Sequence, residues 1–550
     1  MRKLVGIVLA AGLASAACAQ PAPNSPPRTG TPRLIIAISV DQFSADLFDT
    51  YRGQFTGGLA RVASGTVFHN GYQAHAATET CPGHSTILTG SSPAHSGIIA
   101  NNWIDQSVVR PNKSIYCAED ERLAPPNPAA AQGSAGSYAP SPVHLRVQTL
   151  GDIMKSRSPQ SLNVAVAGKD RAAIMMGGRN VDQRWFWDGK QFVTDRPSRV
   201  PATIAQANAA IARTIAAPRP ALTPTPFCTA RAAPIALTPT MTVGNGNFAR
   251  AAGDTRAFRA SPELDGATLA IAASLIQELG LGSDNAPDIL SVGLSATDYV
   301  GHSYGPGGQE MCLQMLSIDR DLGDFFRLLD SRNVDYAVVL TSDHGSLDIP
   351  ERLRARGVQA ARADANLATA GLGRAIGEKL QIAGPVLLGD FAGDVYYDRA
   401  LTGAQRQQVE QIALNYYRSH PQVEAVFTSR QLRNMRVPTA SPDRWTIAQR
   451  VRASFDPQRS GDLYVALKQY VMPIPVPSTG YAATHGSVWD YDRRVPIVFW
   501  RPGTRGSTHS EAVSTTSILP TLEAMLGLRG VAKVDGPCLA TVPNVACPAR

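Results

Sequence analysis

The chain has 550 residues, of which 44% are hydrophobic and 17% are charged. This composition can supply a large buried core and excludes a disordered or coiled-coil chain. The formal net charge is +8, but Lys and Arg are scattered, with no basic run and no interleaved aromatic residues, so a nucleic-acid-binding role is not indicated.

The first residues have the pattern of an export signal. Arg2 and Lys3 precede an apolar run, and small residues follow as far as Ala19, which predicts a signal peptide over residues 1–19. Residues 20–33 are rich in proline and predict a linker. No later apolar run approaches the roughly 18 residues that span a bilayer. We therefore expect a periplasmic or secreted chain, soluble after cleavage and without a membrane span.

Four short aliphatic runs predict buried strands, and two longer patterns predict helices. The strand-like runs lie in residues 33–43, 288–302, 335–346 and 494–500, and the helical patterns lie in residues 266–280 and 516–528. Aliphatic runs of this length, separated by helical patterns, are typical of strands buried on both faces. The sequence therefore predicts an α/β fold with a mostly parallel central sheet and helices on both faces.

Long irregular segments separate these elements. Residues 102–146 and 180–262 are rich in Ala, Pro, Gly and Ser, and residues 350–480 mix helical and loop-like stretches. Acids and histidines of the kind that bind metal stand on both sides of these segments. We therefore interpret the segments as insertions that form a cap on one catalytic domain, residues 34–531. Residues 532–550 would be a C-terminal tail.

Six cysteines remain after removal of the predicted signal peptide, and an even number in an exported chain permits disulfides. Cys538 and Cys547 bracket a short segment that contains proline, and they are the expected pair. The other four, which could pair or stay buried, are Cys81, Cys117, Cys228 and Cys312.

The strand-like runs end in acids and histidines. One run is followed by Asp298 and, four residues later, His302, and His485 stands just before the run at 494–500. One carboxylate and two imidazoles match a catalytic zinc site with an open position. A single aspartate at a strand end is more often a turn or helix cap, and a single histidine is more often structural. The spacing of the whole set favours metal binding.

A second set could hold a second ion. Asp41 ends the first run, Asp343 and His344 end the third, and the hydroxyl of Thr80 could add an oxygen. Because ligands gather beyond the C-terminal ends of parallel strands, the two sets are expected at one edge of the sheet. Two zinc ions about 4 Å apart would suit an in-line phosphoryl displacement.

The stretch HAATETCPGHSTILTG, residues 75–90, admits two interpretations. Pro82 suits a first helical turn, so the stretch could be an ordinary polar loop with a helix start. Alternatively, Thr80 or Cys81 could be a nucleophile at the positive N-terminus of that helix. Taken alone, the stretch favours the first interpretation.

The chain resembles the alkaline phosphatase superfamily, and within it the bacterial periplasmic alkaline phosphatases with a threonine nucleophile, which are related to the nucleotide pyrophosphatase/phosphodiesterases. The resemblance covers residues 34–531. It rests on the motifs ISVDQF, TETCPGHSTILTG, GIIANNW, AGKDRAA, SATDYVGH, TSDHG and ATHGS. It implies an alkaline phosphatase-like fold, two Zn²⁺ ions and small phosphate monoesters as substrates, in a monomeric enzyme.

The resemblance also implies a role for each matching residue. Thr80 matches the nucleophile, Asn101 a residue that contacts a phosphoryl oxygen, and Lys169 with Arg171 the pair that marks monoesterases. One zinc would be held by Asp298, His302 and His485, and the other by Asp41, Thr80, Asp343 and His344. Two cations favour a monoester because it presents one more anionic oxygen than a diester does. The implied activity is hydrolysis of phosphate monoesters through a phosphothreonine intermediate.

Other functions remain to be weighed. A phosphodiesterase or nucleotide pyrophosphatase on the same scaffold is the main alternative, and Lys169 and Arg171 argue against it. A non-catalytic phosphate- or metal-binding protein would be expected to lack a ligand or the nucleophile. A sulfatase would need a different pattern around a Cys or Ser nucleophile. Ser346 and Leu347 depart from the family pattern after Asp343-His344-Gly345, which concerns the loop shape rather than a ligand.

Overall fold

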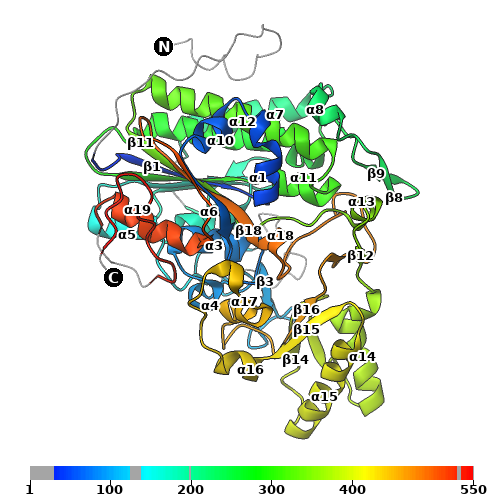
Figure 1. Cartoon of the computed structure of the whole chain (residues 1–550). Coiled ribbons are helices and arrows are strands. Elements are labelled where there is room, and N and C mark those ends of the chain that lie inside the picture. Colours follow the sequence, from blue (N-terminus) through cyan, green and yellow to red (C-terminus); the bar gives the residue numbers. More distant parts are fainter. Residues whose placement is uncertain (1–29, 124–137, 197–199, 529–533, 549–550) are drawn as a thin grey trace.

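The computed structural model describes residues 30–123, 138–196, 200–528 and 534–548. The expected signal peptide and most of the expected linker lie outside these residues. A 10-stranded sheet forms the centre of the molecule (Figure 1). Its strands lie in the order β19 (Ser507–His509), β2 (Thr66–Tyr72), β18 (Arg494–Trp500), β11 (Tyr336–Thr341), β1 (Leu34–Val40), β10 (Asp288–Leu294), β5 (Asn163–Ala167), β6 (Gln183–Trp187) and β7 (Phe192–Val193), with β20 (Val513–Ser514) paired to β2.

The sheet is mostly parallel, as predicted. Strands β11, β1, β10, β5 and β6 all run in one direction. In contrast, β18 runs antiparallel to both of its neighbours, β11 and β2. The residues just before β18 therefore lie at the same edge of the sheet as the residues just after the parallel strands.

Helices cover both faces, because the central strands are apolar on both sides. In β1, Leu34, Ile36 and Ile38 pack into one core, whereas Ile35 and Ala37 pack into the other. The first core includes side chains of α2 (Gly58–Ala63), α7 (Ala202–Ala216), α10 (Pro262–Leu279) and α12 (Gln309–Ser331). The second includes side chains of α3 (Thr80–Thr89), α5 (Leu150–Arg157) and α19 (Ile518–Met525). The helices expected over 266–280 and 516–528 are α10 and α19.

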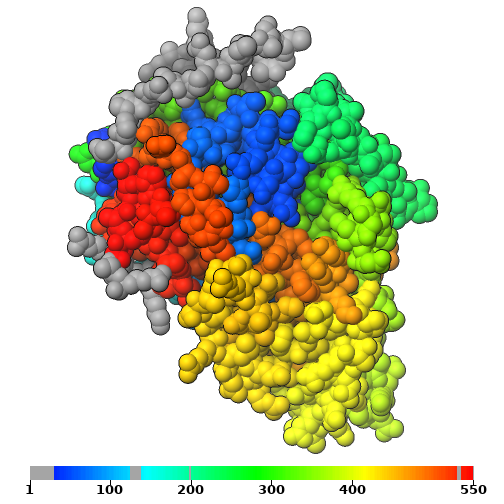
Figure 2. Space-filling view, in the orientation of Figure 1, coloured from blue at the N-terminus to red at the C-terminus, as the bar shows by residue number. Residues whose placement is uncertain are grey.

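Residues 350–480 carry a second, smaller sheet. It is antiparallel, in the order β13 (Leu387–Gly389), β14 (Gly393–Tyr397), β16 (Leu463–Leu467) and β15 (Val423–Thr428). It shares a hydrophobic core with α14 (Thr369–Leu380) and α15 (Gly403–Ser419). This part of the chain projects from the body as the yellow lobe in Figure 2, which agrees with the expected cap.

The other two expected insertions have different structures. Residues 102–146 include the hairpin of β3 (Asn102–Ile104) and β4 (Ser114–Tyr116). Residues 180–262 begin with β6 and β7, which belong to the central sheet, so only the part after β7 is an excursion from it. That part contains α7 and the hairpin of β8 (Ile235–Thr238) and β9 (Met241–Val243).

Further short elements occupy the connections. These are α1 (Ala45–Tyr51), α4 (Pro93–Ser96), α6 (Asp170–Gly177), α8 (Pro226–Thr229), α9 (Thr255–Arg259), α11 (Ala296–Tyr304), α13 (Pro350–Ala355), α16 (Ser429–Asn434), α17 (Ile447–Ser454), α18 (Asp490–Arg493), β12 (Ala361–Arg362) and β17 (Val471–Met472). None of the helices in the described residues has the length and apolar composition that crossing a bilayer requires.

Three disulfides join the six cysteines. The expected pair, Cys538–Cys547, is present in the C-terminal tail. Cys228–Cys312 connects α8 to α12, and Cys81–Cys117 connects the first turn of α3 to the residue after β4. The latter two pairings could not be chosen from the sequence, because they depend on which segments meet in space.

Candidate active site

The acids and histidines singled out in the sequence meet at one edge of the central sheet. Asp41 follows β1, and Asp343 and His344 follow β11. Asp298 and His302 lie one turn apart in α11, which follows β10. His485 reaches the same edge because it precedes the antiparallel strand β18. All six side chains are at least four-fifths buried.

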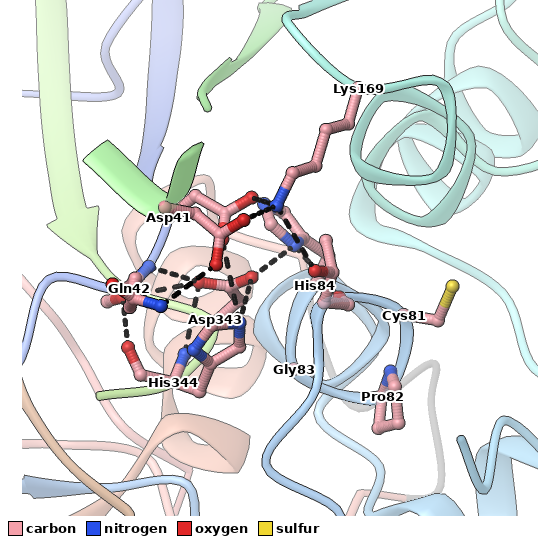
Figure 3. A network of polar contacts seen from close by, with 12 residues as sticks. Asp41, Gln42, Cys81, Pro82, Gly83, His84, Lys169, Asp343 and His344 are labelled. Carbon is pink, nitrogen blue, oxygen red and sulfur yellow. Dashed lines mark hydrogen bonds and ion pairs between the residues drawn. The ribbon is translucent and has the colours of Figure 1, made fainter. Parts of the chain in front are cut away.

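These residues form two adjacent clusters. In the first, Asp298 Oδ1 lies 3.3 Å from His302 Nε2 and 3.3 Å from His485 Nε2. In the second, His344 Nε2 lies 3.5 Å from Asp41 Oδ1 and 3.2 Å from Asp343 Oδ2 (Figure 3). The rings of His344 and His485 stack with centroids 3.5 Å apart, which joins the clusters.

Two sets of ligand-type atoms each lie within 4.8 Å of one another. One is the expected set Asp41, Asp343 and His344. The other combines Asp298 and His485 with His344 rather than with His302. His302 is nevertheless in contact with Asp298, so the structure brings together all the predicted acid and imidazole ligands, with His344 between the two positions.

In each of the three histidines, Nδ1 donates a hydrogen bond to a backbone carbonyl oxygen. His302 Nδ1 lies 2.7 Å from the oxygen of Ala483, His485 Nδ1 lies 2.8 Å from that of Thr78, and His344 Nδ1 lies 3.0 Å from that of Gly345. A carbonyl can only accept, so Nδ1 carries a proton and Nε2 is the ring nitrogen that faces the carboxylates. Metal-ligating histidines are oriented in this way.

Burial keeps two of these imidazoles neutral. It lowers the pKa of His302 to about 4 and the pKa of His344 to about 3. Burial also raises the pKa of Asp41 well above its usual value, and the nearby carboxylate of Asp343 adds to this effect. A set of buried carboxylates that repel one another, next to neutral imidazoles, is stabilised by a bound cation.

The donor set fits divalent zinc. Asp41 Oδ1 and His344 Nε2 are buried atoms without a hydrogen-bond partner among the described residues, as expected of atoms that ligate an ion. Imidazole nitrogen together with carboxylate oxygen is a donor combination that zinc accepts. The residues present can thus hold metal at two neighbouring positions.

Thr80 is the first residue of α3 and is fully buried beside these clusters. Its Oγ1 atom lies 3.4 Å from Lys169 Nζ. The same ammonium group lies 2.7 Å from Asp41 Oδ2 (Figure 3). It also lies 2.6 Å from Asp298 Oδ2. Burial would lower the pKa of Lys169, but Asp298 and Asp41 raise it overall. The hydroxyl at the start of a helix therefore faces a charged lysine that bridges both clusters.

The close approach of α3 to Asp343 requires Gly83. A Cβ atom at this position would lie 2.0 Å from the carbonyl oxygen of Asp343, so no other residue fits. Next to it, His84 Nδ1 lies 3.1 Å from Asp343 Oδ2 and 2.9 Å from the carbonyl oxygen of Thr80. His84 thus connects the first turn of α3 to the carboxylate of Asp343. Sequence reasoning did not assign it a role, although it stands four residues after Thr80 on one helix.

Gln42 is a second residue that sequence reasoning missed. Its backbone N–H donates to Asp343 Oδ1 and its side-chain amide donates to Asp298 Oδ1, both at 3.1 Å. It adopts a φ of 66°, which is uncommon for a residue other than glycine. This strained backbone conformation lets one residue orient a carboxylate in each cluster. In the sequence, only the position of Gln42 next to Asp41 could have indicated this role.

Asn101 and Arg171 lie on the other side of Thr80. Asn101 Oδ1 accepts the backbone N–H of Cys81 at 2.8 Å, and the backbone N–H of Asn101 donates to Glu79 Oε2 at 2.8 Å. Glu79, which sequence reasoning also missed, thereby connects the loop before β3 to the start of α3. Arg171 belongs to α6, close to Lys169, and is partly buried.

The hairpin β3–β4 supports Arg171. Tyr116, the last residue of β4, donates its hydroxyl to Asp170, with 3.0 and 2.9 Å to the two carboxylate oxygens. The hydroxyl of Tyr138 donates to the same carboxylate. Tyr116 also interacts with Arg171 and helps to raise the pKa of its guanidinium above the usual value, against the effect of burial. The cation next to the site is thus held by a network anchored in the hairpin.

A cavity of about 550 Å³ opens on this site. His302 and His485 of the first cluster line it, together with Asn101 and Arg171. Its opposite wall comes from the lobe of residues 350–480. The arrangement can bind an anion near the hydroxyl of Thr80 and leaves room for the group attached to that anion.

The chain is similar to known proteins over nearly its whole length. It is 49% identical to alkaline phosphatase PhoK of Sphingomonas sp. over 519 residues, which cover 93% of this chain and 91% of PhoK. It is 45% identical to alkaline phosphatase PhoD of Zymomonas mobilis, over 95% of this chain and 91% of PhoD. The crystal structure of alkaline phosphatase PafA superposes with a TM-score of 0.80 and 24% identity, over 94% of this chain and 100% of PafA.

The PafA match confirms the predicted fold, including the central sheet with helices on both sides. The family model described as "Type I phosphodiesterase / nucleotide pyrophosphatase" matches residues 35–487. This range contains every predicted nucleophile, ligand and phosphate-binding residue. The chain therefore belongs to the type I phosphodiesterase/nucleotide pyrophosphatase family, within the alkaline phosphatase superfamily.

Proposed function

We propose that the chain is an exported, zinc-dependent alkaline phosphatase that hydrolyses phosphate monoesters through a phosphothreonine intermediate. The observation that carries this proposal is the hydroxyl of Thr80 at the start of α3, 3.4 Å from Lys169 and next to both ligand clusters. The relatives named alkaline phosphatase, at 49% and 45% identity, support the same activity.

Two zinc ions would be held by the chain's own residues. Asp298, His302 and His485 would hold one ion. Asp41, Asp343 and His344, together with the oxygen of Thr80, would hold the other. When bound, zinc supplies Lewis-acid stabilisation of oxygen anions, which favours ionised nucleophile and leaving-group oxygens.

Thr80 would act as the nucleophile. Its oxygen forms a bond to phosphorus while the bond from phosphorus to the ester oxygen breaks, and the alcohol leaves. Water then attacks the phosphothreonine, which releases inorganic phosphate and restores the Thr80 hydroxyl. The N–H groups in the first turn of α3 stabilise negative charge that develops beside Thr80.

Lys169, Arg171 and Asn101 would bind the non-bridging oxygens of the transferred group. Lys169 is buried and Arg171 is partly buried, and both are charged, so each strengthens its interaction with an anion. A monoester offers them one more anionic oxygen than a diester. This is the physical argument for a monoesterase over the phosphodiesterase alternative, whose activity appears in the description of the family.

Export is supported by the cysteines. All six cysteines beyond the predicted signal peptide are paired in disulfides, as is typical of oxidising compartments such as the periplasm.

The test is the ratio of kcat/KM for a nitrophenyl phosphate monoester to that for the matching diester, measured with zinc controlled. We expect the monoester to be strongly preferred, and Lys169→Ala with Arg171→Ala to reduce this preference. Thr80→Ala should abolish the covalent intermediate, whereas Thr80→Ser should retain measurable turnover because a hydroxyl remains. A diester preference in the wild-type enzyme, or phosphate label on a residue other than Thr80 after acid quench, would overturn the proposal.

A further inference from the structure

The cavity is larger than the phosphoryl group that the catalytic residues would bind. Its volume of about 550 Å³ is that of a site for a small molecule. One end is lined by Asn101, Arg171 and His485, and the remainder by the segment of β3 and β4, the lobe and the loop before α18. A bound substrate therefore places its leaving group among the residues of this remainder.

The charges around the cavity are unevenly distributed. Among the described residues that line it, Arg171 is the only Lys or Arg, and it lies at the phosphoryl end. Three carboxylates, Glu79, Asp390 and Asp394, also line the cavity. The cavity lining is thus acidic, although the chain as a whole carries a formal net charge of +8. The leaving group would thus enter a negative environment.

The acidic residues lie at different depths. Asp390 belongs to the turn that joins β13 to β14 and is exposed, whereas Asp394 is the second residue of β14. Asp394 is partly buried and accepts the backbone N–H of Gly461 at 2.7 Å. Burial, with a contribution from Glu79, raises the pKa of Asp394 to about 7, so its carboxyl is charged at alkaline pH. At alkaline pH, the lobe therefore contributes negative charge both at the rim and inside the cavity.

Aromatic faces stand beside these acids. Tyr481 also lines the cavity, is 45% exposed and packs its ring 5.4 Å from the ring of His302. Phe391, next to Asp390, lines the wall formed by the lobe. Exposed aromatic faces near carboxylates attract organic cations, through their quadrupole and through charge.

The acidic residues do not form a third metal cluster. Within the described residues, the two groups at the sheet edge are the only ones whose ligand atoms lie within 4.8 Å of one another. A diffuse set of carboxylates with aromatic neighbours suits a larger organic cation better than a compact metal ion.

We propose that this cavity selects phosphate monoesters whose leaving group carries a positive charge, and disfavours those whose leaving group carries a second negative charge. The inference rests on the proposed phosphatase function and specifies its substrate class. Glu79, Asp390 and Asp394 supply the charge, and Tyr481 and Phe391 supply the aromatic surface. The catalytic residues remain those described above.

The test uses three aryl phosphates that differ in charge at the para position. These are 4-(trimethylammoniomethyl)phenyl, 4-ethylphenyl and 4-(carboxymethyl)phenyl phosphate. The measured quantity is the ratio of kcat/KM for the cationic substrate to that for the anionic one. Comparison of this ratio between wild type and variants cancels the intrinsic reactivity of each substrate. Asp390→Asn should lower the ratio about three- to tenfold, as expected for removal of one partly screened charge, and Asp390→Lys should lower it further.

The control is Glu424→Gln, which neutralises an exposed carboxylate on the same lobe that does not line the cavity. We expect it to leave the ratio unchanged. High salt should reduce the wild-type ratio, because screening weakens exposed charges. A ratio that is equal in wild type, Asp390→Asn and Asp390→Lys would overturn the inference while the proposed function stands. Failure of wild type to hydrolyse any of the three esters, or p-nitrophenyl phosphate, would overturn both.

Discussion

Tyr116 offers a test of how Arg171, one of the two cations proposed to bind phosphate, is positioned. Its hydroxyl lies 3.0 and 2.9 Å from the two oxygens of Asp170 and also interacts with Arg171. Tyr116→Phe removes this hydroxyl and keeps the ring, which packs at 5.2 Å against Tyr138. A hydrogen bond to a charged group contributes about 1.5–3 kcal/mol. Because Tyr138 still donates to Asp170, we expect a loss near the lower end of this range.

A loss of about 1.5 kcal/mol corresponds to roughly a tenfold decrease in kcat/KM. The decrease should be larger for a nitrophenyl monoester than for the matching diester, because Arg171 would serve the additional anionic oxygen. Tyr397→Phe is the control, since the buried hydroxyl of Tyr397 has no hydrogen-bond partner among the described residues. Equal losses on both esters, with an unchanged thermal midpoint, would refute the positioning role of Tyr116.

Three further predictions concern stability and metal. Asp319 accepts four backbone N–H groups at the start of α2, at 2.7, 2.7, 2.8 and 3.1 Å. Asp319→Asn turns an amide nitrogen towards two of these donors and should lower the free energy of unfolding by about 2–4 kcal/mol in urea titration. Asp324→Asn, on the exposed face of α12, the helix that carries Asp319, should change the free energy of unfolding little. Burial raises the pKa of Asp265 from 3.8 to about 7. The protonated carboxyl therefore contributes to folding stability below pH 4, and this contribution is lost as the pH rises through 7. Asp265→Asn should therefore gain stability relative to wild type between pH 5 and 8, and a constant difference in thermal midpoint would contradict this. Chelation should abolish turnover, zinc should restore it, and His302→Ala should bind less zinc by metal analysis while its circular dichroism spectrum stays native.

The sequence allowed the centre of the fold to be predicted because its central strands are buried on both faces. Runs such as 288–294 and 336–341 are mostly apolar and buried throughout, and each is followed by acid or histidine. Parallel strands bring such residues to one edge, so their convergence followed from the pattern. The expected disulfide at Cys538 was predictable because its partner is close in sequence.

Other features depend on contacts between distant segments. The antiparallel direction of β18 cannot be read from its aliphatic residues, yet it explains how His485 reaches the site. The supporting roles of Gln42 and His84 come from bonds to Asp343 that span more than 250 residues. The small sheet of residues 350–480 was also not predicted, because short strands mixed with helices give no clear period.

The disulfide between Cys81 and Cys117 has a consequence for when the enzyme becomes active. It closes a loop across 36 residues of sequence separation and attaches the residue after Thr80 to the residue after Tyr116. Cross-links over loops of this length stabilise the folded state by about 4 kcal/mol, because they restrict the unfolded chain. Before oxidation, the hairpin that supports Arg171 would be held to α3 by weaker bonds alone. We expect newly made, reduced enzyme to be partly latent and to mature once its thiols are oxidised, which would spare the phosphate esters of the compartment where it is synthesised.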